Sequence, residues 1–196
     1  NRCDRPVTGK SNDDSLNLYA YKQQQLSQLM KNPGTGTRGK IGIPMVLNMY
    51  ELLPFWHAFF TNLGFQVIVS PFSNRKLYQA GQGSIPSDTV CFPAKLTHGH
   101  IMALLKKDVD AIFYPCMSYN VDEGLGDNHY NCPVVAYYPE VLAGNIRELE
   151  DTKFIYEYLN LEQRKDFVRL MPKIMQKYYP DLKTSDIHNA IEVAYT

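Results

Sequence analysis

The sequence has no excess of charge of either sign and no long apolar run. Lys plus Arg and Asp plus Glu number 20 each, so no one-sided electrostatic field exists to attract nucleic acid or an anionic membrane. No stretch approaches the roughly 20 apolar residues that a membrane-spanning helix needs. The sequence therefore predicts neither a nucleic-acid partner nor a membrane protein.

Cysteine is also scarce. The four cysteines, Cys3, Cys91, Cys116 and Cys132, are too few and too widely spaced for a secreted, disulfide-rich scaffold. Because no C-x-x-C pair occurs, local spacing does not by itself indicate zinc or iron. Buried structural thiols and metal-ligating thiols both remain open, and reduced thiols favour a cytoplasmic location.

An initiator methionine and a signal-peptide hydrophobic region are both missing from the start at Asn1. The sequence ends at Thr196 inside a predicted helix, so we expect the chain to be part of a longer polypeptide. With 196 residues, of which 44% are apolar, the chain is long enough to form one core without disulfides or metals.

Strand and helix patterns alternate from Lys40 onward. This alternation predicts an α/β fold, namely a three-layer, Rossmann-like or flavodoxin-like domain with a mainly parallel sheet and helical extensions at both termini. We expect a linker and helical arm over residues 1–38, the α/β core over 39–146 and a mostly helical part of the same domain over 147–196.

The expected strands are 41–43, 65–70, 111–114 and 134–138, with a further one at 154–156. Helices are expected from Leu16 to Met30, from 94 to 107, from 161 to 178, and from Thr184 or Ser185, and a further one has Pro54 in its first turn. Gly64 should end the helix that carries Trp56, and Ser73 is a candidate cap for the following helix.

A glycine-rich segment imitates a phosphate-binding loop. Gly34, Gly39 and Lys40 have the spacing of that motif, but Ile41 replaces the Ser or Thr that binds magnesium. The segment also precedes a strand, whereas a true phosphate loop follows one. We therefore do not expect it to bind a nucleotide.

The most promising place for chemistry is the carboxyl edge of the sheet, where ligands of open α/β folds collect. Cys116 follows the third strand directly, and Cys91 precedes the helix that leads into it. Cys132 lies on the opposite edge if the strand at 134–138 is parallel, and on the same edge if that strand is antiparallel or residues 131–133 fold over the edge. Among the five histidines, only His129 is close in sequence to one of these thiols.

Several ordered blocks of the sequence are familiar. They are residues 41–51, 54–56, 84–95, 113–116, 131–135 and 138–141. In these blocks the chain resembles the uncharacterised domain of CoA-substrate-specific enzyme activase-related proteins, over about Lys40 to Asn145.

The resemblance implies a cofactor. Such proteins join ATP-hydrolysing activator domains to regions similar to 2-hydroxyacyl-CoA dehydratase and benzoyl-CoA reductase subunits, which hold a [4Fe-4S] cluster with three cysteines. The resemblance implies that Cys91, Cys116 and Cys132 are the ligands of the cluster. It also implies that the partners are neighbouring activase and dehydratase-like domains and a CoA thioester. ATP is expected to bind outside this chain.

Two functions follow as hypotheses. The first is a redox domain, either a dehydratase-like lyase or its activating component, whose cluster transfers electrons to CoA thioesters or binds them. Its expected anion contacts are Lys76, Lys95 and the backbone amides of Ser73 and Ala94. The second is a non-catalytic docking module with structural cysteines and a tyrosine-rich contact surface.

Overall fold

The computed structural model describes residues 17–122, 124 and 126–196. The predicted polar linker up to Ser15 and the thiol of Cys3 lie outside the described residues. The described helices are α1 (Leu18–Lys31), α2 (Asn48–Glu51), α3 (Leu53–Asn62), α4 (Arg75–Gly81), α5 (Phe92–Leu105), α6 (Pro133–Asn145), α7 (Arg164–Tyr178) and α8 (Thr184–Tyr195). Short 3-10 turns occupy Gln82–Ser84 and Arg147–Leu149.

A four-stranded parallel sheet forms the middle layer, in the order β2-β1-β3-β5. The strands are β1 (Lys40–Ile43), β2 (Gln66–Val69), β3 (Ala111–Phe113) and β5 (Lys153–Ile155). Beyond β3 and β5 the same two chain segments pair again as β4 (Cys116–Met117) and β6 (Tyr158–Leu159), also in parallel. The pairing of β3 with β5 is thereby prolonged past the carboxyl edge of the sheet.

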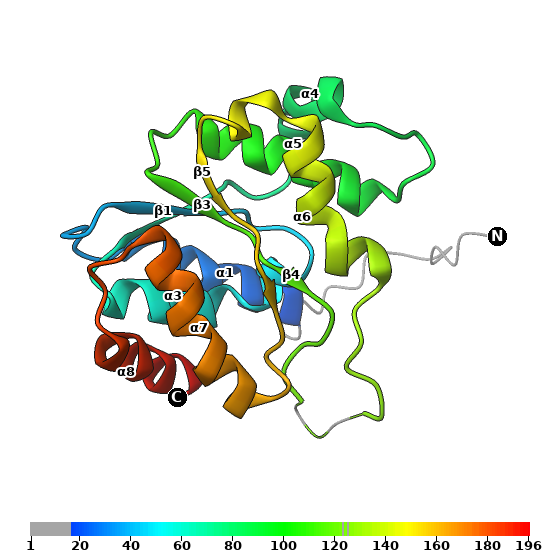
Figure 1. Ribbon diagram of the computed structural model, residues 1–196. Coiled ribbons are helices and arrows are strands. Elements are labelled where there is room, and N and C mark those ends of the chain that lie inside the picture. Colours follow the sequence, from blue (N-terminus) through cyan, green and yellow to red (C-terminus); the bar gives the residue numbers. More distant parts are fainter. Residues whose placement is uncertain (1–16, 123, 125) are drawn as a thin grey trace.

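Helices cover both faces of the sheet (Figure 1). Helices α4, α5 and α6 lie on one face, and α1, α3, α7 and α8 lie on the other. The predicted three-layer α/β fold with a mainly parallel sheet is confirmed. Among the described residues no helix combines the length and apolar character needed to cross a membrane.

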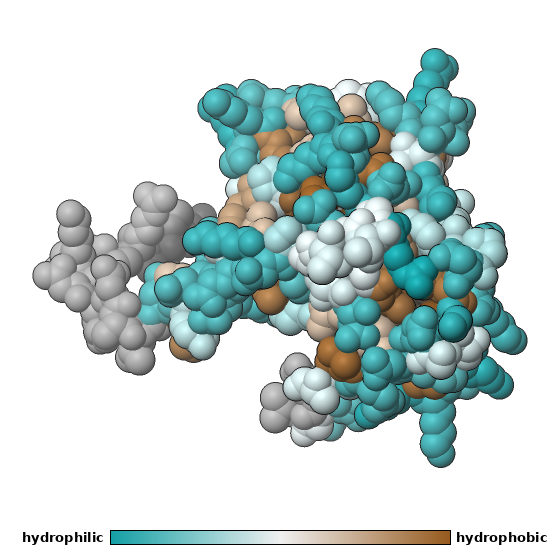
Figure 2. Space-filling view, turned by 90° about the vertical axis from the view of Figure 1, so that its left-hand side faces the viewer, coloured by the Kyte–Doolittle hydropathy of each residue, from teal (hydrophilic) through white to brown (hydrophobic). Residues whose placement is uncertain are grey.

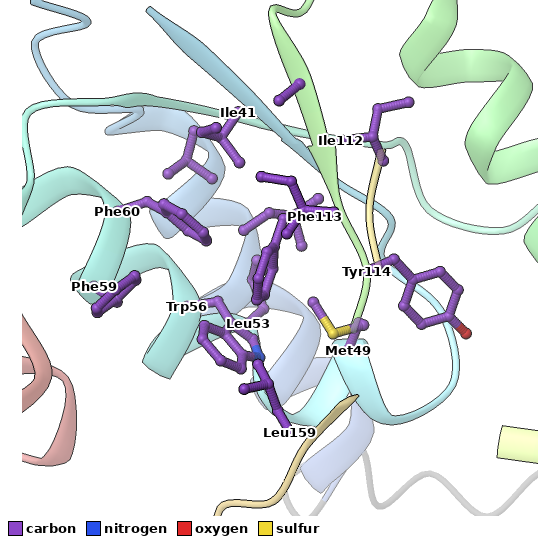
Figure 3. Close-up of a cluster of buried hydrophobic side chains, with 14 of the residues drawn as sticks. Ile41, Met49, Leu53, Trp56, Phe59, Phe60, Ile112, Phe113, Tyr114 and Leu159 are labelled. Atoms are coloured by element: carbon purple, nitrogen blue, oxygen red, sulfur yellow. The ribbon is translucent and has the colours of Figure 1, made fainter. Parts of the chain in front are cut away.

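The core beneath α3 is aromatic. Trp56 packs against Phe113 of β3 with ring centroids 4.6 Å apart, and Phe60 packs against the same ring at 4.9 Å. In Figure 3, Phe113 points toward these two rings, whereas Tyr114 points away from them. Alternate residues of an extended chain face opposite sides, so Tyr114 faces the α5 and α6 layer. Gly64, with a φ of 87°, follows the end of α3 and ends that helix as predicted.

The surface in Figure 2 is mainly hydrophilic, with small separate apolar areas. A surface of this kind is ordinary for a folded domain, because scattered apolar side chains remain exposed on most proteins.

The prediction of a strand at residues 134–138 is wrong, because these residues lie in helix α6. The β-branched and aromatic residues of this segment favour a strand locally. However, Pro133 occupies the first turn of a helix, where its missing N–H and fixed φ are tolerated, and a crossover between the parallel strands β3 and β5 ordinarily carries a helix. Tertiary topology thus overrides local propensity.

Two smaller predictions are also corrected. The cap of α4 is Asn74, whose side chain accepts the backbone N–H of Leu77 at 3.0 Å, and not Ser73. Helix α7 begins at Arg164, three residues later than expected, and continues through Pro172.

Candidate functional site

Cys116 lies at the carboxyl edge of the sheet, on the side covered by α6. The backbone N–H of Tyr114 donates to Ile155 at 2.9 Å and that of Cys116 donates to Glu157 at 3.1 Å, so residues 114 and 116 have the same orientation along one extended segment. The Cys116 side chain is 1% exposed. Burial, followed by the carboxylate of Glu140 on α6, raises the pKa of Cys116 to about 12. A hydrogen bond from the backbone N–H of Glu140 acts in the opposite direction and lowers the pKa of Cys116. This contact places the Cys116 thiol beside the middle of α6.

Cys91 and Cys132 occupy equivalent positions on two helices. Each is the residue immediately before the first helical residue, Cys91 for α5 and Cys132 for α6, and each is exposed. Neither side chain makes a capping hydrogen bond, and each helix has a proline within its first two positions. The first backbone N–H groups of a helix have no intrahelical acceptor, so the starts of α5 and α6 carry unpaired donors beside these two cysteines.

An apolar pocket of about 380 Å³ lies between these two helix starts. Val90, next to Cys91, and Pro133, next to Cys132, both line it. The remaining lining residues are Pro86, Ser87, Val134, Tyr137, Tyr138 and Val141. The residues next to the two exposed cysteines therefore line one apolar surface depression.

Asn131 ties Cys132 to the same edge as Cys116. Its backbone N–H donates to Ser118 at 2.8 Å, and its side-chain amide donates to the carbonyl of Met117 at 2.8 Å. Because α6 is the crossover between the parallel strands β3 and β5, its first residue lies at their carboxyl ends. Of the two arrangements considered for Cys132, the structure has the one with all three thiols at a single edge.

The three thiols are nevertheless not arranged as a ready-made metal site. Glu140, which faces Cys116, follows Cys132 by two turns of α6, or roughly 12 Å at about 1.5 Å per residue. Within residues 17–122, 124 and 126–196, no group of three or more His, Cys, Asp or Glu side chains could hold a metal ion. Cluster binding would require the segments that carry Cys91 and Cys132 to move toward Cys116, because side-chain rotation alone does not span this distance.

Two buried polar side chains near this edge lack hydrogen-bond partners. The hydroxyl of Tyr114, a residue with 0% exposure, has none, although it lies on the same side of the sheet as Cys116. Asn48, which follows β1, is 6% exposed and leaves both its amide oxygen and its amide nitrogen unpaired. Buried polar atoms are almost always paired, so such exceptions often indicate a missing water, ion or ligand.

A buried histidine links α5 to α6 beside the apolar pocket. The Ser84 hydroxyl donates to the carbonyl of Gly81 at 3.0 Å, so its oxygen accepts from Nδ1 of His98 at 2.8 Å. Nε2 of His98 is then the acceptor for the hydroxyl of Tyr138 at 3.1 Å. Burial lowers the pKa of His98 to about 4, so this histidine is neutral at pH 7.

His100 forms a separate network at the ends of β1 and β2. The Met45 N–H donates to the Ser70 hydroxyl oxygen at 2.7 Å, and the same hydroxyl is hydrogen-bonded to Nδ1 of His100 at 2.6 Å. Nε2 of His100 is hydrogen-bonded to the Ser73 hydroxyl at 2.9 Å. Burial lowers the pKa of His100 to about 4 as well.

The other residues predicted for the site do not lie together. His129 lies 3.5 Å from a carboxylate oxygen of Asp122. It lines a different pocket of about 530 Å³, whose other lining residues are Glu51, Leu52, Asn120, Val121, Gly126, Asn128, Tyr130 and Asn131. Lys95 donates to the carbonyl of Asp88 at 2.7 Å. Tyr114 and the His98 network were not predicted, and only the two-residue spacing of Tyr114 from Cys116 offered a signal in the sequence.

Comparison with known families gives one match. The model of the CoA enzyme activase uncharacterised domain (DUF2229) matches residues 40–196, well over half of the chain. The searches among curated proteins and among solved structures returned no match. The family match begins at β1 and includes every described strand and all helices from α2 to α8. The chain therefore belongs to the CoA enzyme activase uncharacterised domain family.

Proposed function

We propose that this domain binds a [4Fe-4S] cluster through Cys91, Cys116 and Cys132 and serves electron transfer to, or dehydratase-like chemistry on, CoA thioesters. The observation that carries the proposal is that three cysteines far apart in the sequence share the carboxyl edge of one sheet, arranged around α6. When bound, such a cluster supplies low-potential electron transfer.

The donor chemistry suits this cofactor. Thiolates are the preferred ligands of iron–sulfur clusters. Cys91 and Cys132 are exposed and lie at the starts of two helices. The adjoining pocket is apolar, and a low-polarity surrounding helps to exclude water from a cluster.

Cys116 contributes the fixed part of the site. It is held by backbone pairing between β4 and β6, whereas Cys91 and Cys132 are exposed and free to change their side-chain rotamers. The start of α6 lies roughly 12 Å along the helix from Glu140, which faces Cys116, so side-chain rotation alone does not bring Cys132 to Cys116. Assembly of the site would therefore require the chain before α5 and α6 to move toward Cys116.

Anaerobic reconstitution with iron and sulfide tests the proposal. The wild-type protein should become brown and hold about four irons and four sulfides per chain, the composition of the proposed cluster. Cys116→Ser should abolish the visible absorption. Cys3→Ser is the control, because Cys3 is outside the proposed ligand set, and it should leave iron content unchanged.

The alternative function is a docking module with structural cysteines. It is favoured by α6, whose only charged residue is Glu140 and whose apolar side chains line the exposed pocket described above. A protein that stays colourless and free of iron after anaerobic reconstitution would support this alternative and contradict the cluster.

A further inference from the structure

The strands β1 and β3 are neighbours in the sheet, but the chain leaves them in opposite directions. It leaves β1 through α3, on one face of the sheet, toward β2. It leaves β3 through α6, on the other face, toward β5 (Figure 1). Such a reversal opens a crevice beyond the carboxyl ends of the two strands, and ligands of open α/β sheets bind in this crevice.

The pocket of about 530 Å³ lies between the two segments that leave this point. Glu51 and Leu52, which follow β1, form one wall, and the remaining lining residues all belong to the connection from β3 to α6. The volume is within the range of about 300–1,000 Å³ that is usual for small-molecule sites. This pocket shares no lining residue with the apolar pocket beside Cys91 and Cys132, so an inference about it does not depend on the proposed cluster.

The segment after β1 has two further unusual features. Leu47 has a φ of 52°, in the left-handed region that residues other than glycine rarely adopt. The next residue, Asn48, is the buried amide without a hydrogen-bond partner described above. Strained backbone and unpaired buried polar atoms are uncommon in folded proteins and occur preferentially at functional sites.

A pair of side-chain amides gives the opposite wall fixed hydrogen-bonding groups. The Asn131 amide donates to the carbonyl of Met117 at 2.8 Å and to the amide oxygen of Asn120 at 3.3 Å. The Asn120 amide donates to the amide oxygen of Asn131 at 3.0 Å. Asn120 therefore retains one N–H and one lone pair on its oxygen. A hydroxyl group both donates and accepts through the same atom, so it matches this combination.

The charge of the pocket excludes strongly anionic ligands. Among the described residues that line it, none is Lys or Arg, and Glu51 is ion-paired with Lys22 of α1. A phosphate or carboxylate would find no cation on these walls. The exposed ring of Tyr130 is held edge-on by Tyr119, with ring centroids 4.9 Å apart, and offers a flat apolar face.

We propose that this pocket binds a neutral sugar ring, as a free sugar or as the ribose of a nucleoside. Hydroxyl groups of the ring bond to the amide of Asn120 and to the carboxylate of Glu51. The C–H face of the ring packs on Tyr130.

Nuclear magnetic resonance of the ¹⁵N-labelled protein tests this proposal. The protein is titrated with methyl β-D-glucoside, adenosine and ATP, without iron or sulfide. At least one of the two neutral compounds should cause saturable shifts of the backbone amides of Glu51, Asn120 and Tyr130 at millimolar concentration. ATP should bind more weakly than adenosine, because its phosphates meet no cation.

Three variants locate the ligand. Tyr130→Ala and Glu51→Ala, on opposite walls, should each weaken binding several-fold, whereas Tyr156→Ala, at an exposed position outside the pocket, should leave binding unchanged. Amide shifts far from the pocket show whether each variant keeps its fold. If one pocket variant misfolds, the other still tests its own wall.

Binding of adenosine alone identifies a nucleoside, and binding of the glucoside identifies a free sugar. Either result supports the proposed ligand class. The absence of saturable shifts at the pocket with both neutral compounds would overturn the proposal, and so would tighter binding of ATP than of adenosine. Unchanged binding in folded Tyr130→Ala and Glu51→Ala would place the ligand elsewhere. None of these results depends on whether the protein takes up iron.

Discussion

The hydroxyl of Tyr138 donates to Nε2 of His98 across 3.1 Å and joins helix α6 to helix α5. The bond lies beside the apolar pocket that Cys91 and Cys132 border. It fixes the tautomer of His98, because Nδ1 must then carry the proton that Ser84 accepts. The position of α6 at the carboxyl edge thus depends in part on a polar contact between two buried side chains.

Tyr138→Phe should lower the free energy of unfolding by about 1–3 kcal/mol, because His98 is left with a buried acceptor that nothing pairs. Urea denaturation measures the change. Tyr137→Phe is the control, since that hydroxyl is on an exposed side chain and contacts Ser118 at 3.3 Å. Its effect should stay within about 0.5 kcal/mol. Equal effects of the two variants would contradict the importance of the buried bond.

The protein should lose stability in mild acid. Burial lowers the pKa of His98 and of His100 to about 4, against 6.5 in an unfolded chain. The unfolded chain therefore binds more protons between these values, so the stabilisation is complete above pH 6.5 and is lost as the pH falls toward 4. Each histidine contributes up to about 3 kcal/mol to this loss, at roughly 1.4 kcal/mol per pKa unit.

Unfolding in urea at pH 7.5, 6 and 5 measures this dependence. His100→Gln should be less stable than the wild type at pH 7.5 but should have a shallower decline with falling pH. His188→Gln, at an exposed position on α8, should follow the wild-type curve. A wild-type stability that does not change between pH 7 and pH 5 would contradict neutral, buried histidines.

Helices α4 and α5 cross so closely that a methyl group does not fit between them. A Cβ on Gly99 would lie 2.0 Å from the carbonyl oxygen of Leu77. Gly99→Ala should therefore destabilise the fold by more than about 3 kcal/mol, since backbone must move to relieve the overlap. Gly144→Ala, where nothing lies within 4 Å, should instead stabilise α6 by about 0.5–1 kcal/mol. Circular dichroism during heating compares the two variants, and similar melting temperatures would contradict the close crossing.

The three thiols should react with iodoacetamide in a fixed order. Cys91 and Cys132 are exposed at helix starts, whereas Cys116 is buried and its pKa is raised to about 12. At pH 8 the thiolate fraction of Cys116 is on the order of 1 in 10,000 from its pKa alone, so alkylation of the folded protein should spare it. Peptide mass mapping after minutes of labelling, with a urea-unfolded sample as control, measures each site separately. Rapid labelling of Cys116 in the folded protein would show that the carboxyl edge opens readily.

Much of the fold could be predicted from local patterns. The apolar runs at β1, β2, β3 and β5 and the stop at Gly64 were recognisable, because strand formation and helix termination depend on neighbouring residues. The helix after Cys132 could not be recognised from the sequence, because its strand-forming residues are held in a helix by the crossover from β3 to β5.

The candidate site shows the same division. The sequence by itself determined that the chain has three candidate ligand thiols, that Cys116 follows a buried strand, and that the family is the CoA enzyme activase uncharacterised domain. Only the tertiary structure decided that Cys132 shares an edge with the other two thiols and that Tyr114 is left with an unpaired hydroxyl. The physical reason is that strand and helix tendencies arise between residues a few positions apart, whereas edges, burial and unpaired atoms depend on which distant segments pack together.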